Sequence, residues 1–203
     1  NEWLIENGHL ALKRYPENIT SPTKLEIDWS NTKAWGWGGY YSRIFFNVKN
    51  REPNGIILPG DFEATREALR QEIEAMRGPS GEPLGNKTFL SKDLYPDGSI
   101  GDDPDLYVYF GDLKWRSAGT VGHQQLFLEE NDTGPDDAVH AKHGVFFQSW
   151  KRDLEGMDGS IDPNAILENK PIHEYVIYDI FPTIMQHFNI PVPEGLRGTP
   201  IST

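Results

Sequence analysis

The sequence predicts a domain of mixed α/β or α+β class, and two observations lead to this prediction. Apolar residues recur at helical spacing over 61–77 and 180–189, whereas the run at 106–110 is continuously apolar and rich in aromatic and β-branched residues. Amphipathic helices mixed with strands are typical of layered α/β or α+β domains. With 203 residues, the chain is long enough to bury a sizeable core.

Composition excludes several classes of protein. The formal net charge is −12, and a negative field repels phosphate backbones, so we expect no general nucleic-acid binding. The absence of cysteine excludes disulfides, thiolate catalysis and cysteine-based metal sites. No apolar run approaches the roughly 20 residues that span a bilayer, and no secretory signal opens the chain. We therefore expect a soluble, cytoplasmic protein without a membrane partner.

The first third of the chain changes its pattern from helix to strand. Residues 1–8 are predicted to form a short helix with Asn1 as its N-cap. Alternating apolar residues at 25–29 and an aromatic, β-branched run at 43–48 predict strands. The run WGWGGYY at 35–41 lies between them. Its glycines permit positive φ angles or close backbone approach, and its rings need a surface to pack on.

The clearest helix is predicted over 61–77. Asp61 can cap its start, and Gly78–Pro79 end it. Its second face carries charges of both signs, and we interpret this face as a solvated surface. The charged residues of that face are Glu63, Arg66, Glu67, Arg70 and Glu74.

The second half of the chain contains two further strands and a last helix. The run at 106–110 is typical of a strand buried on both faces, and 144–147 is a second candidate strand. A helix is predicted over 180–189, with Asp179 as N-cap and Pro182 in its first turn. Its apolar face consists of Ile180, Ile184, Met185 and Phe188.

The stretch from 105 to 147 is the richest in chemistry. Asp132, Asp136, Asp137, His140 and His143 fall within twelve residues, and carboxylates and imidazoles are ligands for hard or borderline metal ions. Spacing alone also fits a tight turn, in which aspartate side chains bond their own backbone. Both interpretations remain open at this point.

Longer motifs indicate a family. The runs DLKWRSAGTVGH at 112–123 and ENDTGPDDAVHAKHG at 130–144 resemble the type I phosphodiesterase and nucleotide pyrophosphatase family of the alkaline phosphatase superfamily, in particular its archaeal and bacterial branch of predicted phosphohydrolases. The resemblance extends over nearly the whole chain. The other similar segments are 1–8, 33–41, 47–55, 177–184 and 189–198.

The resemblance implies an α/β fold with a mostly parallel sheet and helices on both faces. The chain would be the C-terminal part of an alkaline-phosphatase-like fold, with an α+β insertion. Residues 1–12 would enter from the N-terminal half of the same protein, 13–104 would form the insertion or cap, and 105–203 would belong to the main domain. The nucleophile and most metal ligands of the family precede the segment similar to 1–8, so no catalytic nucleophile is expected in this chain, which alone should be inactive.

The resemblance also implies two divalent metal ions, zinc or manganese. The family's last metal-binding histidine lies in a loop before an apolar strand, and His140 fits that description, with His143 as the rival. We expect Asp132, Asp136 and Asp137 to shape or support the loop that carries the ligand.

A phosphoester or nucleotide-like small molecule is the implied substrate. A guanidinium matches phosphate oxygens, and an indole can stack on a base, so Arg116 and Trp115 are candidate substrate-binding residues, although both could instead pack and pair internally. The aromatic run at 35–41 would belong to the insertion beside the active site. Two alternatives to the phosphodiesterase remain: a non-catalytic binding or assembly module, and a mononuclear metal hydrolase that uses His140 and His143 together.

Overall fold

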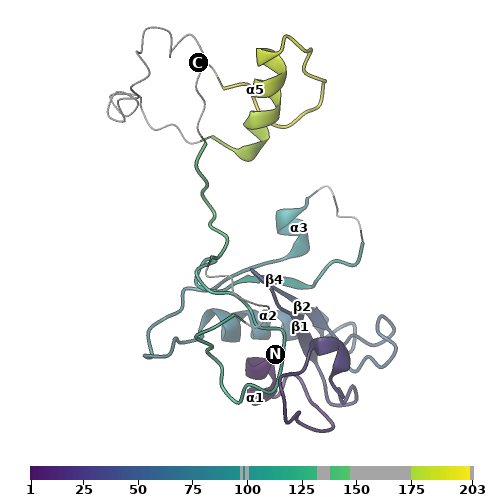
Figure 1. Ribbon diagram of the computed structural model, residues 1–203. Coiled ribbons are helices and arrows are strands. Elements are labelled where there is room, and N and C mark those ends of the chain that lie inside the picture. The colour runs from purple at the N-terminus through teal and green to yellow at the C-terminus, as the bar shows by residue number, and fades with distance from the viewer. Residues whose placement is uncertain (97, 99–100, 132–137, 147–174, 202–203) are drawn as a thin grey trace. The chain divides into compact units, whose positions relative to one another are not determined.

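The computed structural model forms two compact units, Asn1–Val145 and Phe146–Thr203, and each is described by itself (Figure 1). Unit 1 contains a four-stranded sheet with α2 against it, and the described part of unit 2 contains one α-helix. The structure describes residues 1–96, 98, 101–131, 138–146 and 175–201.

The helices and strands of unit 1 are mostly short. They are α1 (Glu2–Glu6), the 3-10 helix η1 (Pro22–Lys24), β1 (Ala34–Trp37), β2 (Ser42–Phe46), α2 (Phe62–Glu74), β3 (Lys87–Phe89), α3 (Ser91–Leu94) and β4 (Leu106–Tyr109). Unit 2 contains the 3-10 helix η2 (Ile177–Asp179) and α5 (Ile180–His187). Within the described ranges, every helix is too short or too polar to cross a bilayer.

The sheet is antiparallel throughout, with the strand order β1-β2-β4-β3. The expectation of a mostly parallel sheet with helices on both faces is therefore wrong. Only residues 38–41 join β1 to β2, and so short a connection permits a hairpin but not the crossover that a parallel pair requires. The register places Ile44 of β2 opposite both Gly36 of β1 and Leu106 of β4.

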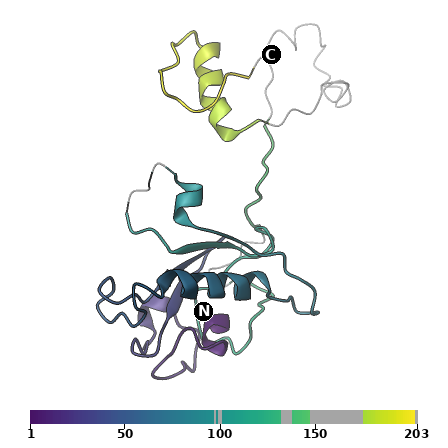
Figure 2. The same ribbon diagram turned by 180° about the vertical axis from the view of Figure 1, so that it is seen from behind.

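One face of the sheet is covered by α2, which runs across it in Figure 2. Aliphatic side chains from α2 and the strands are buried together, and Phe62 at the start of α2 meets Phe46 edge-on at 5.8 Å between ring centroids. Burial of such side chains is the dominant favourable term in folding. This core includes Ile44, Phe46, Leu69, Ile73, Leu106 and Val108.

The prediction that 106–110 forms a strand buried on both faces is confirmed for β4. Leu106, Tyr107 and Val108 are all buried, and β4 lies between β2 and β3 in the sheet. Burial raises the pKa of the Tyr107 phenol above its ordinary value. A continuously apolar run therefore marked an inner strand correctly, although not its direction.

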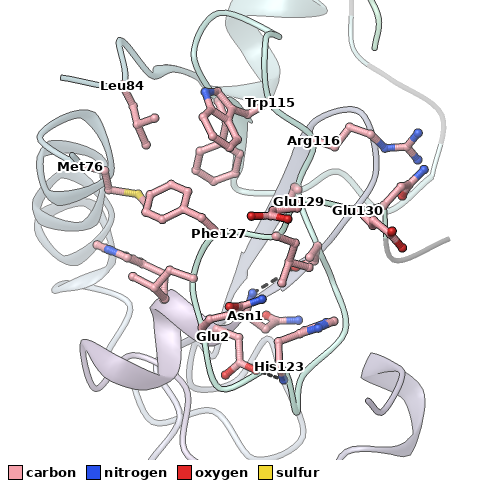
Figure 3. Close-up of a pocket in the computed structure, with 18 of the residues that line it drawn as sticks. Asn1, Glu2, Met76, Leu84, Trp115, Arg116, His123, Phe127, Glu129 and Glu130 are labelled. Atoms are coloured by element: carbon pink, nitrogen blue, oxygen red, sulfur yellow. Dashed lines mark hydrogen bonds between the residues drawn. The ribbon is translucent and has the colours of Figure 1, made fainter. Parts of the chain in front are cut away.

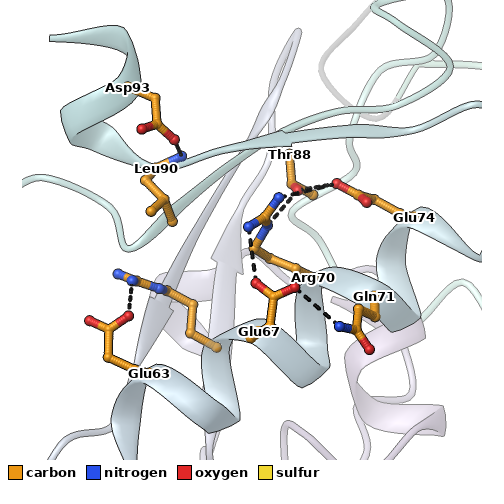
Figure 4. Close-up of polar contacts among 9 residues, drawn as sticks. Glu63, Glu67, Arg70, Gln71, Glu74, Thr88, Leu90 and Asp93 are labelled. Atoms are coloured by element: carbon orange, nitrogen blue, oxygen red, sulfur yellow. Dashed lines mark hydrogen bonds and ion pairs between the residues drawn. The ribbon is translucent and has the colours of Figure 1, made fainter.

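Polar contacts also join α2 to the sheet (Figure 4). Arg70 donates from Nε to the hydroxyl of Thr88 on β3 at 3.0 Å, and that hydroxyl donates to Glu74. The Arg70 guanidinium also pairs with Glu67 at 3.0 Å. The charged face of this helix is thus not solvated along its whole length, because Arg70 and Glu74 bond to a buried threonine.

Other local predictions vary in outcome. The helices predicted at 1–8 and 61–77 are confirmed as α1 and α2, although α2 ends at Glu74. The strand predicted at 25–29 is wrong, since Ile27 makes only a single bridge to Leu12. Residues 144–146 form no strand either, and the last residue of that prediction lies outside the described residues.

Unit 2 is organised around the start of α5, which confirms the helix predicted there. The two carboxylate oxygens of Asp179 accept hydrogen bonds from the backbone N–H groups of Thr199 at 2.8 Å and Val176 at 3.0 Å. The hydroxyl of Thr183 accepts from the N–H of Ile201 at 2.8 Å. These bonds fold the end of the chain back onto the first turn of the helix.

Candidate functional site

A cavity of about 750 Å³ lies in unit 1, between α1, the end of α2 and the segments 110–118 and 123–131 (Figure 3). Trp115 and Arg116, the two candidate substrate-binding residues, both line it. In Figure 3, Met76, Leu84 and Trp115 lie at one end of the cavity, whereas Arg116 and Glu130 lie at the other. The cavity can therefore receive a ligand with one apolar and one charged end.

A left-handed turn sets the position of Trp115. Gly111, Asp112 and Leu113 have φ angles of +57°, +55° and +74°, and the turn closes with a 3.1 Å hydrogen bond from the N–H of Trp115 to the carbonyl of Phe110. A leucine in this region costs on the order of 1–3 kcal/mol. A Cβ on Gly111 would lie 2.7 Å from the Trp115 ring, so the indole packs where only glycine leaves room.

An ion pair anchors this turn to the sheet. Lys87 of β3 donates to the Asp112 carboxylate at 2.6 Å, and this hydrogen bond lowers the pKa of Asp112. Because the folded-state pKa is lowered, the pair persists as the pH falls to the ordinary aspartate pKa, and its contribution is lost only below it.

The glycine pair in WGWGGYY docks on the segment that follows Trp115. Gly39 and Ser117 exchange two backbone hydrogen bonds, each of 2.8 Å. A Cβ on Gly38 would lie 2.3 Å from the backbone of both Ser117 and Gly119, so glycine is required there. The prediction of close backbone approach at this run is confirmed, and Gly39 has the positive φ of +138° that was also anticipated.

This docking brings Tyr40 beside Arg116. Gly39 and Ser117 pair in an antiparallel bridge, so Tyr40, which follows Gly39, lies opposite Arg116, which precedes Ser117. The Arg116 guanidinium lies 4.3 Å from the Tyr40 ring centroid, and the His140 imidazole stacks on the same ring at 3.7 Å with an interplanar angle of 13°. Two of the predicted site residues thus meet on a tyrosine that sequence reasoning did not single out.

Asn1 ties β1 to the segment behind the cavity. Its side-chain amide accepts from the N–H of Gly36 at 2.9 Å and donates to the carbonyls of Gly36 at 2.8 Å and Gly119 at 2.6 Å. Although Asn1 occupies the N-cap position of α1, its side chain makes no capping hydrogen bond, so the predicted capping role is wrong. The asparagine instead joins the backbone of Gly36 to that of Gly119, three residues after Arg116.

Glu2 holds the turn at His123 on another wall of the cavity. One of its oxygens accepts from the N–H groups of Gly122 and His123, each at 2.8 Å, and from the Tyr15 hydroxyl at 2.8 Å. Burial and the hydrogen bond to Glu2 raise the pKa of Tyr15. The imidazole of His123 lies 2.7 Å from the Thr120 hydroxyl. No short motif marks Glu2, because the residues that it joins are about 120 positions away in the sequence.

The described residues do not by themselves supply a complete set of ligands for the pair of zinc or manganese ions that the resemblance implies. Among them, no group of three or more histidine, aspartate or glutamate side chains is arranged to hold a metal ion. His140 and His143 are both exposed, and they belong to no such group. The predicted loop residues Asp132, Asp136 and Asp137 lie outside the described residues.

Comparisons of the chain with protein-family models, with curated proteins and with solved structures gave no significant match. Interpretation of the site therefore depends on the motifs of the sequence and on the geometry of the cavity. In that geometry Trp115 and Arg116 both line the cavity, and Tyr40 joins His140 to Arg116.

Proposed function

We propose that the chain binds a phosphoester with an aryl or nucleotide-like group in the cavity beside Trp115 and Arg116, and that it forms part of a metal-dependent phosphodiesterase or nucleotide pyrophosphatase. The observation that supports binding most directly is that both side chains line this cavity, with Trp115 at its apolar end and Arg116 at its charged end (Figure 3). A guanidinium bonds two phosphate oxygens at once, and an indole offers a flat apolar surface to a ring. The volume of about 750 Å³ is typical of small-molecule sites.

The charges around the cavity favour a phosphodiester over a phosphomonoester. Arg116 and Lys114 line the cavity together with the acidic residues Glu129 and Glu130. A phosphodiester carries one negative charge at neutral pH, whereas a monoester carries nearly two, and repulsion by nearby carboxylates grows with the charge of the ligand. A singly charged diester with an organic group at the apolar end therefore suits this lining.

Hydrolysis is the part of the proposal that depends on the sequence resemblance. In a complete site, His140 would supply one ligand to the metal pair, and the N-terminal half of the same protein would supply the nucleophile and the remaining ligands. The residues described in this chain hold no such set of ligands, so no catalytic step is assigned to them. Their part is to bind and orient the phosphoester.

Titration with bis(p-nitrophenyl) phosphate tests the binding proposal. Arg116→Ala should weaken binding about 10- to 100-fold, because a charge-assisted hydrogen bond contributes roughly 1.5–3 kcal/mol. Arg116→Lys should bind with intermediate affinity, since it keeps the charge but loses the planar fork. Arg14→Ala is the matched control, because Arg14 is exposed, pairs with Glu17 and does not line the cavity.

Equal loss of affinity in Arg14→Ala and Arg116→Ala would show that the probe responds only to net charge. No binding by the unaltered chain would contradict the cavity as a phosphoester site. Isothermal titration calorimetry gives both answers, provided that circular dichroism shows every variant to be folded.

The hydrolase assignment has a separate test in the gene. Coding sequence before Asn1 that carries Asp and Thr or Ser motifs and ends in Asp-His-Gly would support it, and a start codon directly before Asn1 or near it would contradict it. The protein made from that full coding sequence should cleave bis(p-nitrophenyl) phosphate when zinc or manganese is supplied. His140→Ala should lower both the cleavage rate and the bound metal, which atomic absorption measures.

A non-catalytic binding module is the second candidate function. It is favoured by one observation: the described residues line a cavity that can receive a ligand. Binding of the probe without hydrolysis by the product of the full coding sequence, with zinc and with manganese, would favour the module over the enzyme.

A further inference from the structure

Tyr40 contacts two of the residues assigned to the site, and it reaches them from a distant part of the sequence. Its ring lies 4.3 Å from the Arg116 guanidinium carbon and 3.7 Å from the centroid of the His140 imidazole. At these distances two flat groups are too wide to lie side by side on one phenol ring, so they must cover its opposite faces. The ring is therefore a spacer between a guanidinium and an imidazole.

The backbone leaves Tyr40 little choice of position. The two hydrogen bonds between Gly39 and Ser117 fix the residue before it, and Gly38 is pressed against Gly119 where no side chain fits. These contacts fix the backbone that precedes Tyr40, unlike the backbone of an exposed tyrosine on an unsupported loop. Rigid support is what a residue needs if it is to orient its neighbours.

The ring of Tyr40 in turn restricts its two neighbours in the stack. Arg116 has a long side chain with many rotamers, and the π-face of a tyrosine restricts the plane of its guanidinium. His140 is exposed, but its neighbour Val139 lines the cavity, so the stack on Tyr40 holds the segment at 138–143 beside the cavity.

We propose that Tyr40 is a positioning residue, which fixes Arg116 and His140 on opposite faces of its ring so that both are held at the cavity. The guanidinium of Arg116 is then pre-oriented toward the ligand, and the imidazole of His140 is kept beside the cavity. The aromatic ring carries this role and the hydroxyl does not, because both contacts are made to the ring. The effect on ligand binding depends on the proposed function, whereas the effect on His140 does not.

Nuclear magnetic resonance of the whole chain tests the stack directly. The ring current of Tyr40 should shift the His140 ring protons upfield from their positions in an unstructured chain, with nuclear Overhauser effects between the two rings. Tyr40→Leu should return the His140 protons to the unstructured positions, and Tyr40→Phe should keep the shift. Tyr41→Leu is the matched control, because Tyr41 packs on Tyr107 and Tyr109 instead.

A binding measurement then links the stack to the site. With bis(p-nitrophenyl) phosphate as probe, Tyr40→Leu should bind about two- to fivefold more weakly than the unaltered chain. Tyr40→Phe should bind with the affinity of the unaltered chain. Tyr40→Leu could weaken binding by the expected two- to fivefold and still leave the shifts of the His140 ring protons unchanged. That result would overturn the positioning role, because Tyr40 would then act on Arg116 alone.

The two proposals fail in different ways. If the unaltered chain binds no probe but His140 shows the shift and its loss in Tyr40→Leu, the positioning role of Tyr40 is supported and the phosphoester site is contradicted. If the probe binds but the unaltered chain gives no contact between the Tyr40 and His140 rings, the positioning role is overturned. That last measurement needs no variant, so misfolding of Tyr40→Leu cannot obscure it.

Discussion

The helices α2 and α5 are both amphipathic, but they differ in the burial of their apolar side chains. In α2 the apolar residues Leu69 and Ile73 are 1% and 2% exposed, because the helix lies against the sheet. In the described structure of α5, Phe181 and Ile184 are 53% and 50% exposed, and the buried positions are Pro182 and Thr183. Apolar periodicity thus predicted both helices and the covered face of α2, but it did not predict the exposure of apolar side chains on α5.

The source of stability differs accordingly. α2 is held by burial of aliphatic side chains and by the bonds of Arg70 and Glu74 to Thr88. The start of α5 is held by backbone N–H groups that donate to Asp179 and Thr183. The same helical pattern can therefore be stabilised by an apolar interface in one place and by a polar frame in another. Three substitutions test this contrast.

The largest effect is expected in α2. Ile73→Ala should lower the free energy of unfolding of unit 1 by about 2–5 kcal/mol, because it removes buried methyl groups and leaves a cavity under the helix. Urea denaturation followed by tryptophan fluorescence measures this change. Ile19→Ala, at a position 62% exposed in the same unit, is the control and should change stability by less than about 0.5 kcal/mol. Equal effects at the two positions would contradict the buried interface.

An intermediate effect is expected from the polar frame of unit 2. Asp179→Ala leaves the N–H groups of Val176 and Thr199 without their acceptor, at a cost of about 1–3 kcal/mol. Hydrogen exchange at the Thr199 amide should accelerate about 5- to 150-fold, since each 1.4 kcal/mol changes the exchange rate tenfold. Glu194→Ala, at an exposed acid in the same unit, should leave this exchange unchanged. An unchanged exchange rate of the Thr199 amide in Asp179→Ala would show that the hydrogen bonds to Asp179 do not stabilise the start of α5.

The smallest effect is expected from Ile184→Ala, the same substitution as in α2 made on the exposed face of α5. The change in stability should stay within about 0.5 kcal/mol, because little apolar surface is lost and alanine has the higher helix propensity. Hydrogen exchange of the α5 amides gives the local free energy. A loss near that of Ile73→Ala would mean that this face is covered in solution, and the contrast between the helices would then disappear.

Local elements were predictable because they depend on near neighbours in the sequence. Helical spacing gave α1, α2 and α5, and the apolar run gave β4. The direction of the strands was not predictable in this way, since it depends on which segments pair. A parallel sheet was inferred from resemblance, whereas the short connection at 38–41 and the pairing of β4 with β2 and β3 make the sheet antiparallel.

The candidate site shows the same division. The residue types of Trp115 and Arg116 indicated a phosphoester-binding role, and both side chains line the cavity. Tyr40 and Glu2 were missed, because the contacts that join them to the site, with Arg116 and with the N–H group of Gly122, span 76 and 120 positions of the sequence. The one local signal for Tyr40 was the glycine pair before it, which marked a close approach but not its partner.

The sequence by itself determined the helices, the inner strand β4 and the chemical character of Trp115 and Arg116, since propensity, periodicity and residue chemistry act over short distances along the chain. Only the tertiary structure decided the strand directions, the exposure of apolar side chains on α5 and the meeting of Arg116 with His140 on Tyr40. These features depend on contacts between distant segments, and no periodicity in the sequence encodes which surface will be the partner of another.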